Sequence, residues 1–433
     1  MMDESRPGEY LALFPHVQLV RGAAGVAVHD LFRSRVFWFR GKAVAEALAR
    51  MAMGERCDQA AGGAGISPLE LDQYLAVFSE LDLGTRVPQR TANHAFRPHL
   101  TRSQAREKGV FQTGGTVTVE FAADCVYQCP WCTSKNMLTA QACSCGVWPA
   151  RGARISAETR ISTIERLHEQ GRSKLVVRGG EPLLYWDDLL LVLHASARLG
   201  MSVEIHSTGV LLTERQIEAL KGIKVHFVLL LAAETEDGFD GAVGRRGSWN
   251  ALMAAIQLLR RSRIAFTAQI PVLASENGSR AHLAEWAFGL GASRVEWLIY
   301  APAGTKPAEF RAAVAPASPQ AMAVGLDRFF ANAQCQHCFA NNCFIGADGS
   351  VTPCIGIREP LARLGEIDVT QVLQEDRLGP PQESTARRQI PECARCEFRF
   401  GCCSCLVRTT EWKGTQRARH WDCNYDPESA AWG

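Results

Sequence analysis

The chain has 433 residues, 47% of them hydrophobic and 21% charged, and its formal net charge is +2. This length predicts about two to four domains, and the composition is ordinary for a soluble globular protein. The small net charge gives no reason to expect nucleic acid or an acidic membrane as a partner. The N-terminal sequence is acidic without a long apolar run, and no stretch reaches the length of a membrane span. We therefore expect a cytoplasmic protein without a signal peptide.

Sixteen cysteines, unevenly placed, are the first unusual feature of the composition. Only Cys57 precedes residue 125, five cysteines lie between residues 125 and 145, and ten lie between residues 335 and 423. Cytosolic thiols stay reduced, so cysteines crowded in this way indicate metal ligation or catalysis rather than disulfides. Thiols that served only as small packing groups would be scattered.

The first 88 residues predict three short strands followed by two helices, an order that resembles a winged helix-turn-helix domain. The strands are expected over 17–22, 25–32 and 35–41, and the helices over 42–54 and 67–84. A Gly-rich loop is expected between the helices at 60–65. Ser67 and Pro68 have the residue types of a helix N-cap and first turn.

A basic linker is expected over 89–112, where one acid, Glu107, stands against several cations: Arg90, Arg97, Arg102, Arg106 and Lys108. It is interpreted as a solvated connector, and the alternative is a strip that touches an acidic leader peptide.

Residues 113–310 predict regular alternation of strand and helix. Strands that are apolar nearly throughout are expected over 116–122, 174–179, 202–207, 225–231, 264–273 and 294–301. Amphipathic helices are expected over 156–171, 187–200, 213–222, 248–262 and 279–291, with a capping box formed by Thr213 and Gln216. Six such units predict an α/β fold, a partial (β/α)6 barrel of parallel strands, with the working groups at the C-terminal strand ends.

A Pro/Ala-rich stretch at 301–319 is interpreted as a linker leading into a helix at Ser318, and the last segment is assigned to residues 311–433. From Cys335 onward the cysteines are dense and the predicted secondary structure is thin. A region of this kind is expected to need metals because its own core is small.

Directly after the first barrel strand, Cys125, Cys129 and Cys132 follow the spacing C-x3-C-x2-C. Three thiolates on one loop suit a soft metal, and a [4Fe–4S] cluster with only three protein ligands keeps one iron open for a small molecule. This motif, with Trp131 before its last cysteine, resembles the radical S-adenosylmethionine (SAM) superfamily, and the resemblance implies that Trp131 contacts SAM.

Further residues at the strand ends match the superfamily. Gly179, Gly180 and Glu181, followed by a proline, resemble its GGEP motif, in which the glycines let the backbone approach SAM and the carboxylate meets the SAM amino group. Ser207 and Thr208 resemble its ribose-contacting turn, without the usual Asn. Contacts to the SAM carboxylate are assigned to Arg246 or its neighbour Arg245, with Gln269 as a further SAM contact. The alternatives to SAM binding are that the glycines only form a strand-to-helix turn and that the arginines are surface residues without a ligand.

The resemblance implies the chemistry. SAM binds the open iron, and an electron from a donor such as flavodoxin or ferredoxin allows its cleavage to methionine and a 5′-deoxyadenosyl radical, which abstracts hydrogen from an unactivated carbon. The barrel positions the cofactor, and no catalytic acid or base of the protein is assigned.

The late cysteines resemble the SPASM extension of peptide-modifying radical SAM enzymes, which implies two auxiliary [4Fe–4S] clusters and three clusters in all. The first auxiliary cluster is assigned to Cys338, Cys343, Cys354 and Cys405, and the second to Cys393, Cys396, Cys402 and Cys423. Cys335 and Cys403 are rival ligands, because Cys402 and Cys405 depart from the family spacing. A zinc ribbon would need its two CxxC pairs farther apart than they are here. Cys143 and Cys145 match no family motif.

The N-terminal segment resembles the leader-recognition domain of enzymes that mature ribosomally synthesised peptides. The sequence therefore predicts an enzyme that abstracts hydrogen from a precursor peptide and closes a thioether or carbon–carbon cross-link, without nucleic-acid or membrane partners. One alternative is an anaerobic sulfatase maturase that forms formylglycine, although Ile355 replaces the acidic residue which that family places after the cysteine matching Cys354. The other is an iron–sulfur redox sensor that binds DNA, which the acidic character of the helix at 67–84 disfavours.

Overall fold

The computed structural model describes residues 9–91, 115–133, 137–139, 154–302, 304–315, 318–334, 338, 342–357, 360–366, 368–369, 387–413 and 418–433. The chain forms two compact units. One, the barrel unit, consists of residues 113–314 and 341–380. The other, the mixed unit, combines residues 1–112 with 315–340 and 381–433. Cys143, Cys145 and Cys335, and nearly all of the predicted linker, lie outside the described residues.

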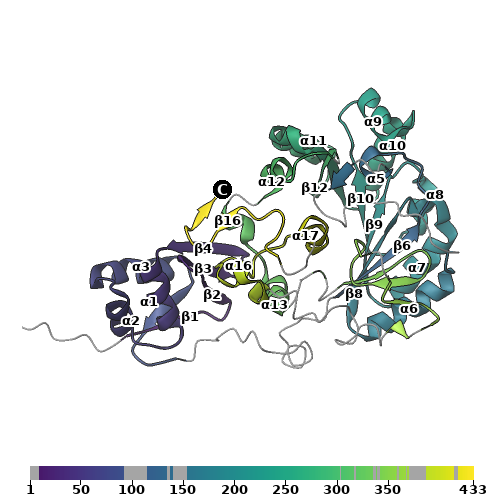
Figure 1. The fold of residues 1–433 in the computed structure, drawn as a ribbon. Helices are drawn as coiled ribbons and strands as arrows, with labels where there is room; N and C mark the ends of the chain where they lie inside the picture. The colour runs from purple at the N-terminus through teal and green to yellow at the C-terminus, as the bar shows by residue number, and fades with distance from the viewer. Residues whose placement is uncertain are drawn as a thin grey trace, which may run out of the picture. The chain divides into compact units, whose positions relative to one another are not determined.

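The barrel unit is built on the six parallel strands that the sequence predicts, so the predicted fold class is confirmed (Figure 1). Each strand pairs in parallel with the next along the chain. The strands are β6 (Gly115–Ala122), β8 (Arg172–Gly179), β9 (Ser202–Ser207), β10 (Val225–Leu230), β11 (Phe266–Leu273) and β12 (Arg294–Pro302).

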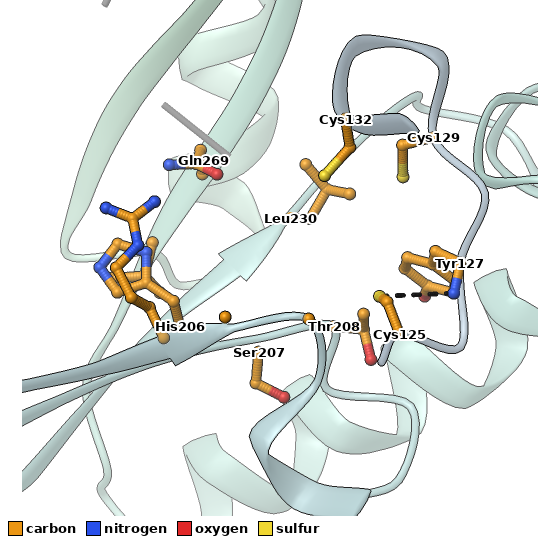
Figure 2. Close-up of a pocket in the computed structure, with 13 residues that line it drawn as sticks. Cys125, Tyr127, Cys129, Cys132, His206, Ser207, Thr208, Leu230 and Gln269 are labelled. Carbon is orange, nitrogen blue, oxygen red and sulfur yellow. Dashed lines mark hydrogen bonds between the residues drawn. The ribbon is translucent and has the colours of Figure 1, made fainter. Parts of the chain in front are cut away.

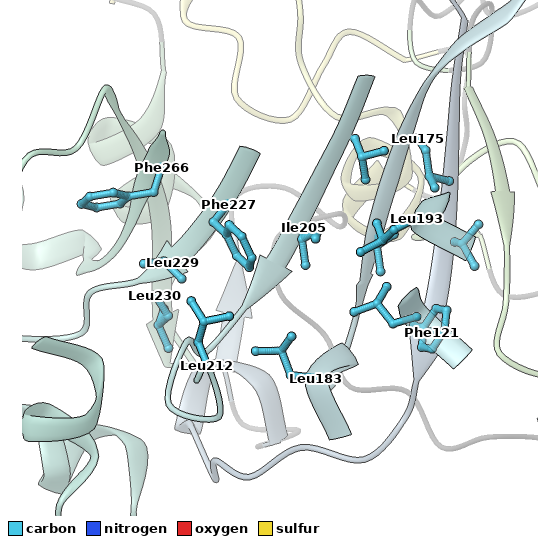
Figure 3. Close-up of a cluster of buried hydrophobic side chains, with 14 of the residues drawn as sticks. Phe121, Leu175, Leu183, Leu193, Ile205, Leu212, Phe227, Leu229, Leu230 and Phe266 are labelled. Carbon is cyan, nitrogen blue, oxygen red and sulfur yellow. The ribbon is translucent and has the colours of Figure 1, made fainter. Parts of the chain in front are cut away.

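Helices alternate with these strands close to their predicted positions. They are α6 (Ala157–Glu169), α7 (Trp186–Arg198), α8 (Glu214–Ala219), α10 (Ser248–Arg261) and α11 (Arg280–Gly289). The predicted capping box of α8 is present, because Thr213 Oγ1 accepts from Gln216 N and Gln216 Oε1 accepts from Thr213 N. Apolar side chains of strands and helices form one buried core, which includes Leu175, Ile205, Phe227 and Leu193 (Figure 3).

The sequence missed several pieces of the barrel unit. Strand β13 (Asn342–Ile345) extends the sheet by pairing in parallel with β6, and β14 (Ser350–Thr352) and β15 (Ala362–Arg363) follow it antiparallel. Strand β7 (Met137–Thr139) pairs antiparallel with β12. Helix α9 (Glu236–Val243) precedes α10, and helix α12 (Pro307–Val314) lies where we expected only a linker. A Pro at the first turn is compatible with a helix, which explains the last error.

The mixed unit begins with the predicted order of strands and helices. Strands β2 (Val17–Arg21), β3 (Gly25–Asp30) and β4 (Arg35–Arg40) form an antiparallel sheet. Helices α1 (Lys42–Ala52) and α3 (Pro68–Glu80) follow, and Ser67 caps α3 in a capping box with Glu70. The predicted Gly-rich loop is wrong, since these residues belong to helix α2 (Cys57–Ala64), which ends at the left-handed Gly65. A short sheet pairs β1 (Tyr10–Leu13) with β5 (Gly84–Val87).

The C-terminal elements of the mixed unit pack on the N-terminal sheet. Helices α13 (Leu326–Gln334) and α16 (Pro391–Ala394), the short helices η3 (Pro319–Met322) and η5 (Arg387–Gln389), α17 (Leu406–Lys413), and strands β16 (Tyr425–Asp426) and β17 (Ala431–Trp432) make up this part. The buried Glu397 accepts hydrogen bonds from Trp38 Nε1 at 2.9 Å and from the Tyr425 hydroxyl at 2.6 Å. Gly22 and Gly25 leave space for the Glu397 side chain, because a Cβ at either position would overlap it.

The predicted boundaries at residues 88, 112 and 310 stay predictions, and the compact units group the chain differently from sequence order. Within the described residues, no helix is both long enough and apolar enough to cross a membrane.

Candidate active site

A pocket opens at the C-terminal ends of the barrel strands, where a parallel α/β barrel carries its working groups. The loop after β6 contributes the three motif cysteines, and the ends of β8, β9, β10 and β11 supply the rest of the wall (Figure 2). The lining residues are Cys125, Tyr127, Cys129, Cys132, Arg178, Gly179, Gly180, His206, Ser207, Thr208, Val228, Leu230 and Gln269. The structure therefore brings together eight residues that the sequence singled out: the three cysteines, both glycines, Ser207, Thr208 and Gln269.

The cysteine loop is held by its own backbone and by its neighbours. Its last turn is the short helix α5 (Pro130–Thr133), which begins at a proline, and Cys132 N donates to the Cys129 carbonyl at 3.0 Å. Gln128 N donates to the Val243 carbonyl at the end of α9, at 2.9 Å. The buried Trp131 does not line the pocket, and its ring packs on that of Tyr300 with 5.3 Å between centroids. Its predicted contact with SAM stays a prediction.

Gly180 allows β8 and the cysteine loop to approach closely. A Cβ on Gly180 would lie 1.8 Å from the Asp124 carbonyl oxygen and 2.3 Å from its carbon, which no side chain could avoid. The same carbonyl accepts a hydrogen bond from Glu181 N at 2.7 Å. The glycine of the predicted motif is therefore required by backbone packing directly beside Cys125.

The Glu181 carboxylate joins the ends of β8 and β9 beneath the pocket wall. It is fully buried, and its two oxygens accept from Leu183 N at 2.9 Å, the Ser207 hydroxyl at 2.8 Å, Thr208 N at 2.6 Å and the Thr208 hydroxyl. Burial raises the pKa of Glu181, and these hydrogen bonds oppose the rise. The carboxylate is thus bonded to protein groups that the sequence also assigned to SAM binding, and its predicted contact with the SAM amino group stays a prediction.

We expect Glu181→Gln to lower the free energy of unfolding of the barrel unit by about 2 kcal/mol, because the amide would turn a donor toward other donors. Urea denaturation followed by circular dichroism measures this. Glu169→Gln, at an exposed position near the end of α6, is the matched control. Equal midpoints for the two variants would contradict the structural role of Glu181.

Arg178 and His206 line the pocket, although the sequence analysis did not single them out. In Figure 2, His206 and Gln269 lie on the opposite side of the pocket from Cys129 and Cys132. No local pattern in the sequence identifies either residue, because their place in the wall depends on which strand ends meet around the pocket. Arg246, in contrast, is exposed and is not among the lining residues, so its predicted contact to the SAM carboxylate has no support from the pocket.

The donor set of the pocket fits an iron–sulfur cluster. Cys125, Cys129 and Cys132 all carry thiols, and Tyr127 N donates to Cys125 Sγ at 3.5 Å, as backbone amides do toward cluster sulfurs. No three His, Cys, Asp or Glu side chains of the described residues converge tightly enough to hold a single metal ion. Ligands of a four-iron cluster lie farther apart than ligands of one ion, because each thiolate binds a different iron.

The four late cysteines that the sequence assigns to the second auxiliary cluster all belong to the mixed unit. Cys396, Cys402 and Cys423 border a buried apolar cluster around Phe398 and Tyr425. Cys393 lies close enough to Cys423 and Cys402 to interact electrostatically with both. Burial raises the pKa of Cys393 to about 11 and that of Cys402 to about 12, so without metal these thiols are protonated at neutral pH. Their role as ligands stays a prediction.

The cysteines assigned to the first auxiliary cluster belong to both units. Cys343 and Cys354 are in the barrel unit, and Cys338 and Cys405 are in the mixed unit. Cys343 is buried in the barrel core on β13, and burial raises its pKa to about 12. The rival Cys403 is exposed and lies beside Arg328, whose Nη1 is 3.8 Å from its sulfur.

The sequence and the fold are both similar to those of known proteins. The family model described as "Radical SAM superfamily" matches residues 119–287. A PqqA peptide cyclase from Gluconobacter oxydans is 29% identical over 183 residues, which are 42% of this chain and 48% of that protein. The matched region thus spans about half the length of this curated relative.

Solved structures share the fold. A crystal structure of Streptococcus suis SuiB bound to precursor peptide SuiA has a TM-score of 0.54 and 13% identity, over 95% of this chain and 98% of that one. A structure of anSMEcpe with bound AdoMet has a TM-score of 0.53 and 12% identity, over 71% and 90% of the two chains.

The barrel, the thiol-bearing loop and the pocket at the strand ends define an enzyme of the α/β-barrel class. The family match makes the assignment more specific: residues 119–287, which form most of the barrel, match the radical SAM superfamily, and the curated relative with sequence similarity is named a peptide cyclase.

Proposed function

We propose that this protein is a peptide maturase that abstracts hydrogen from a ribosomally synthesised precursor peptide and closes a thioether or carbon–carbon cross-link. The observation that carries the proposal is the pocket itself, where Cys125, Cys129 and Cys132 face the polar ends of β8, β9 and β11. Two similar proteins support a peptide as the substrate. One is named PqqA peptide cyclase, and the SuiB structure contains the bound precursor peptide SuiA.

The residues of the pocket have distinct roles in this proposal. The three cysteines hold a [4Fe–4S] cluster which, with SAM bound, supplies the 5′-deoxyadenosyl radical. Gly179 and Gly180 keep the β8 end narrow, so that SAM can lie against the backbone. Val228 and Leu230 give an apolar wall that limits water near the reacting carbon.

The mixed unit is proposed to bind the leader of the precursor. Its three-stranded sheet has two edge strands, β2 and β4, and an extended peptide can add to such an edge through backbone hydrogen bonds. This mode gives affinity without reading the residues that are modified, which suits an enzyme whose leader and modified core are separate parts of one peptide.

Cross-linking removes two hydrogen atoms from the peptide and therefore releases an electron. Two auxiliary [4Fe–4S] clusters, held by the late cysteines, are proposed to accept it, and a flavodoxin or ferredoxin would supply the electron for SAM cleavage. The gathering of Cys393, Cys396, Cys402 and Cys423 in one unit supports one of these clusters.

Sulfatase-type maturation of a Ser or Cys residue is the second candidate, because anSMEcpe, which shares the fold, is also known with AdoMet and the Kp18Cys peptide bound. Ile355, buried after Cys354, argues against it, since an apolar side chain cannot serve there as the acid–base group that this chemistry requires.

The test is anaerobic incubation of the reconstituted protein with SAM, dithionite and a precursor peptide encoded beside it. We expect 5′-deoxyadenosine and a peptide lighter by two hydrogen atoms. A new aldehyde on Ser or Cys would favour the sulfatase-type reaction, and an absence of 5′-deoxyadenosine would overturn the proposal.

A further inference from the structure

A histidine–glutamate pair forms part of the pocket wall that faces the cysteines. Glu204 and His206 are two residues apart on β9, so their side chains project from the same face of the sheet. His206 Nε2 lies 3.0 Å from Glu204 Oε1, and the two side chains are 18% and 13% exposed. Only His206 of the pair lines the pocket, and Glu204 lies behind it.

Glu204 is held as a carboxylate. Lys174 Nζ donates to its second oxygen, Oε2, at 2.8 Å, and Arg294 is 4.0 Å from the same oxygen. Burial by itself would raise the pKa of Glu204, but the hydrogen bonds from His206 and Lys174 outweigh it and the pKa is lowered. An ionised carboxylate can only accept, and the proton of the short contact therefore belongs to His206 Nε2.

This tautomer leaves the lone pair on His206 Nδ1, and no described residue donates a hydrogen bond to that atom. Burial lowers the pKa of His206, and this effect exceeds the opposing hydrogen bond to Glu204. Arg178 on β8 also lowers it, while Glu296 on β12 raises it. The facing positions on β10 and β11 carry no charge, since they are Val228, Leu230 and Gln269. His206 is therefore neutral at pH 7 and able to accept a proton.

Building on the proposed function, we infer that His206, oriented by Glu204, is the base that accepts the proton released when the peptide cross-link closes. Hydrogen abstraction leaves a carbon radical on the peptide. Its bond to a second peptide group forms as an S–H or C–H bond of that group breaks, which releases one proton and one electron. The proton goes to His206 Nδ1, and the electron goes to an oxidised iron–sulfur centre. Glu204 is a positioning residue that fixes the tautomer and stabilises the imidazolium that forms.

The inference is tested by measuring cross-linked peptide formed per 5′-deoxyadenosine in the reconstituted full chain. In His206→Ala and His206→Gln we expect this ratio to fall about 100-fold, the usual contribution of a general base, while 5′-deoxyadenosine is still made. Continued 5′-deoxyadenosine formation also shows that the variants are folded. Glu204→Gln should lower the ratio less, and added imidazole should partly restore it in His206→Ala. His226→Gln is the matched control, because His226 is a half-buried barrel histidine that does not line the pocket.

The pH dependence of this ratio shows whether His206 acts as a base or only stabilises the structure. In the unaltered protein the ratio should fall as the pH decreases through the lowered pKa of His206, below the ordinary value near 6.5, because an imidazolium cannot accept a proton. His206→Gln should lose this acid limb. An unchanged ratio and acid limb in the His206 variants would overturn the inference alone. An unaltered protein that makes 5′-deoxyadenosine but no cross-link would overturn the proposed function instead.

Discussion

Replacement of Cys125, Cys129 or Cys132 by Ala is expected to abolish SAM cleavage, with 5′-deoxyadenosine falling to the level of a reaction without enzyme. Each thiolate binds a separate corner of the cluster, so the loss of one leaves an iron without its protein ligand. The iron content should fall by about a third, the share of one cluster in three, because the late cysteines are unchanged. Iron analysis and quantification of 5′-deoxyadenosine by liquid chromatography measure the two effects.

The matched control is Cys57→Ala, a buried cysteine of helix α2 that belongs to none of the predicted ligand sets. It should keep both its iron and its SAM cleavage. Cleavage retained in any of the three loop variants would mean that the cluster has been assigned to the wrong cysteines.

The second large effect is expected for Gly180→Ala. The added methyl carbon would overlap the Asp124 carbonyl, at 1.8 Å in the present backbone, so the cysteine loop or β8 must move. A displacement of about 1 Å at a reacting centre costs on the order of 100-fold in rate. We expect SAM cleavage to fall at least that far, and SAM affinity, measured by equilibrium dialysis, to fall with it.

Gly289→Ala provides the control, because Gly289 ends helix α11 and a Cβ there would meet no atom within 4 Å. Its activity should equal that of the unaltered chain. Wild-type SAM affinity in Gly180→Ala would show that the close approach of β8 to the loop is dispensable.

The barrel was predictable because parallel strands covered by helices have a nearly continuous apolar pattern, and five amphipathic helices alternate with the six strands. The six strands are confirmed to within a few residues. Strands β13 to β15 were not predictable, since β13 pairs with β6 across more than 200 residues of chain and no local pattern encodes that contact. Helix α2 was mistaken for a loop because Gly62 and Gly63 have poor helix propensity, whereas packing of Ala60 and Ala61 in the core stabilises the helix.

Some residues of the site could also be predicted from the sequence, and others depend on the tertiary structure. Residues within recognisable motifs, such as Cys125 and Gly180, could be placed from spacing alone. Arg178 and His206 could not, because their importance depends on which strand ends meet around one pocket. The grouping of the late cysteines with the N-terminal sheet is likewise a tertiary property, set by contacts such as that between Trp38 and Glu397.

The central claim is that the radical made in this pocket acts directly on a peptide. The most direct measurement is the mass of the 5′-deoxyadenosine formed when the precursor peptide carries deuterium on its side-chain and α carbons. The account predicts 5′-deoxyadenosine that is heavier by one deuterium and a peptide that has lost it. Unlabelled 5′-deoxyadenosine, formed at the same rate with and without peptide, would contradict the claim.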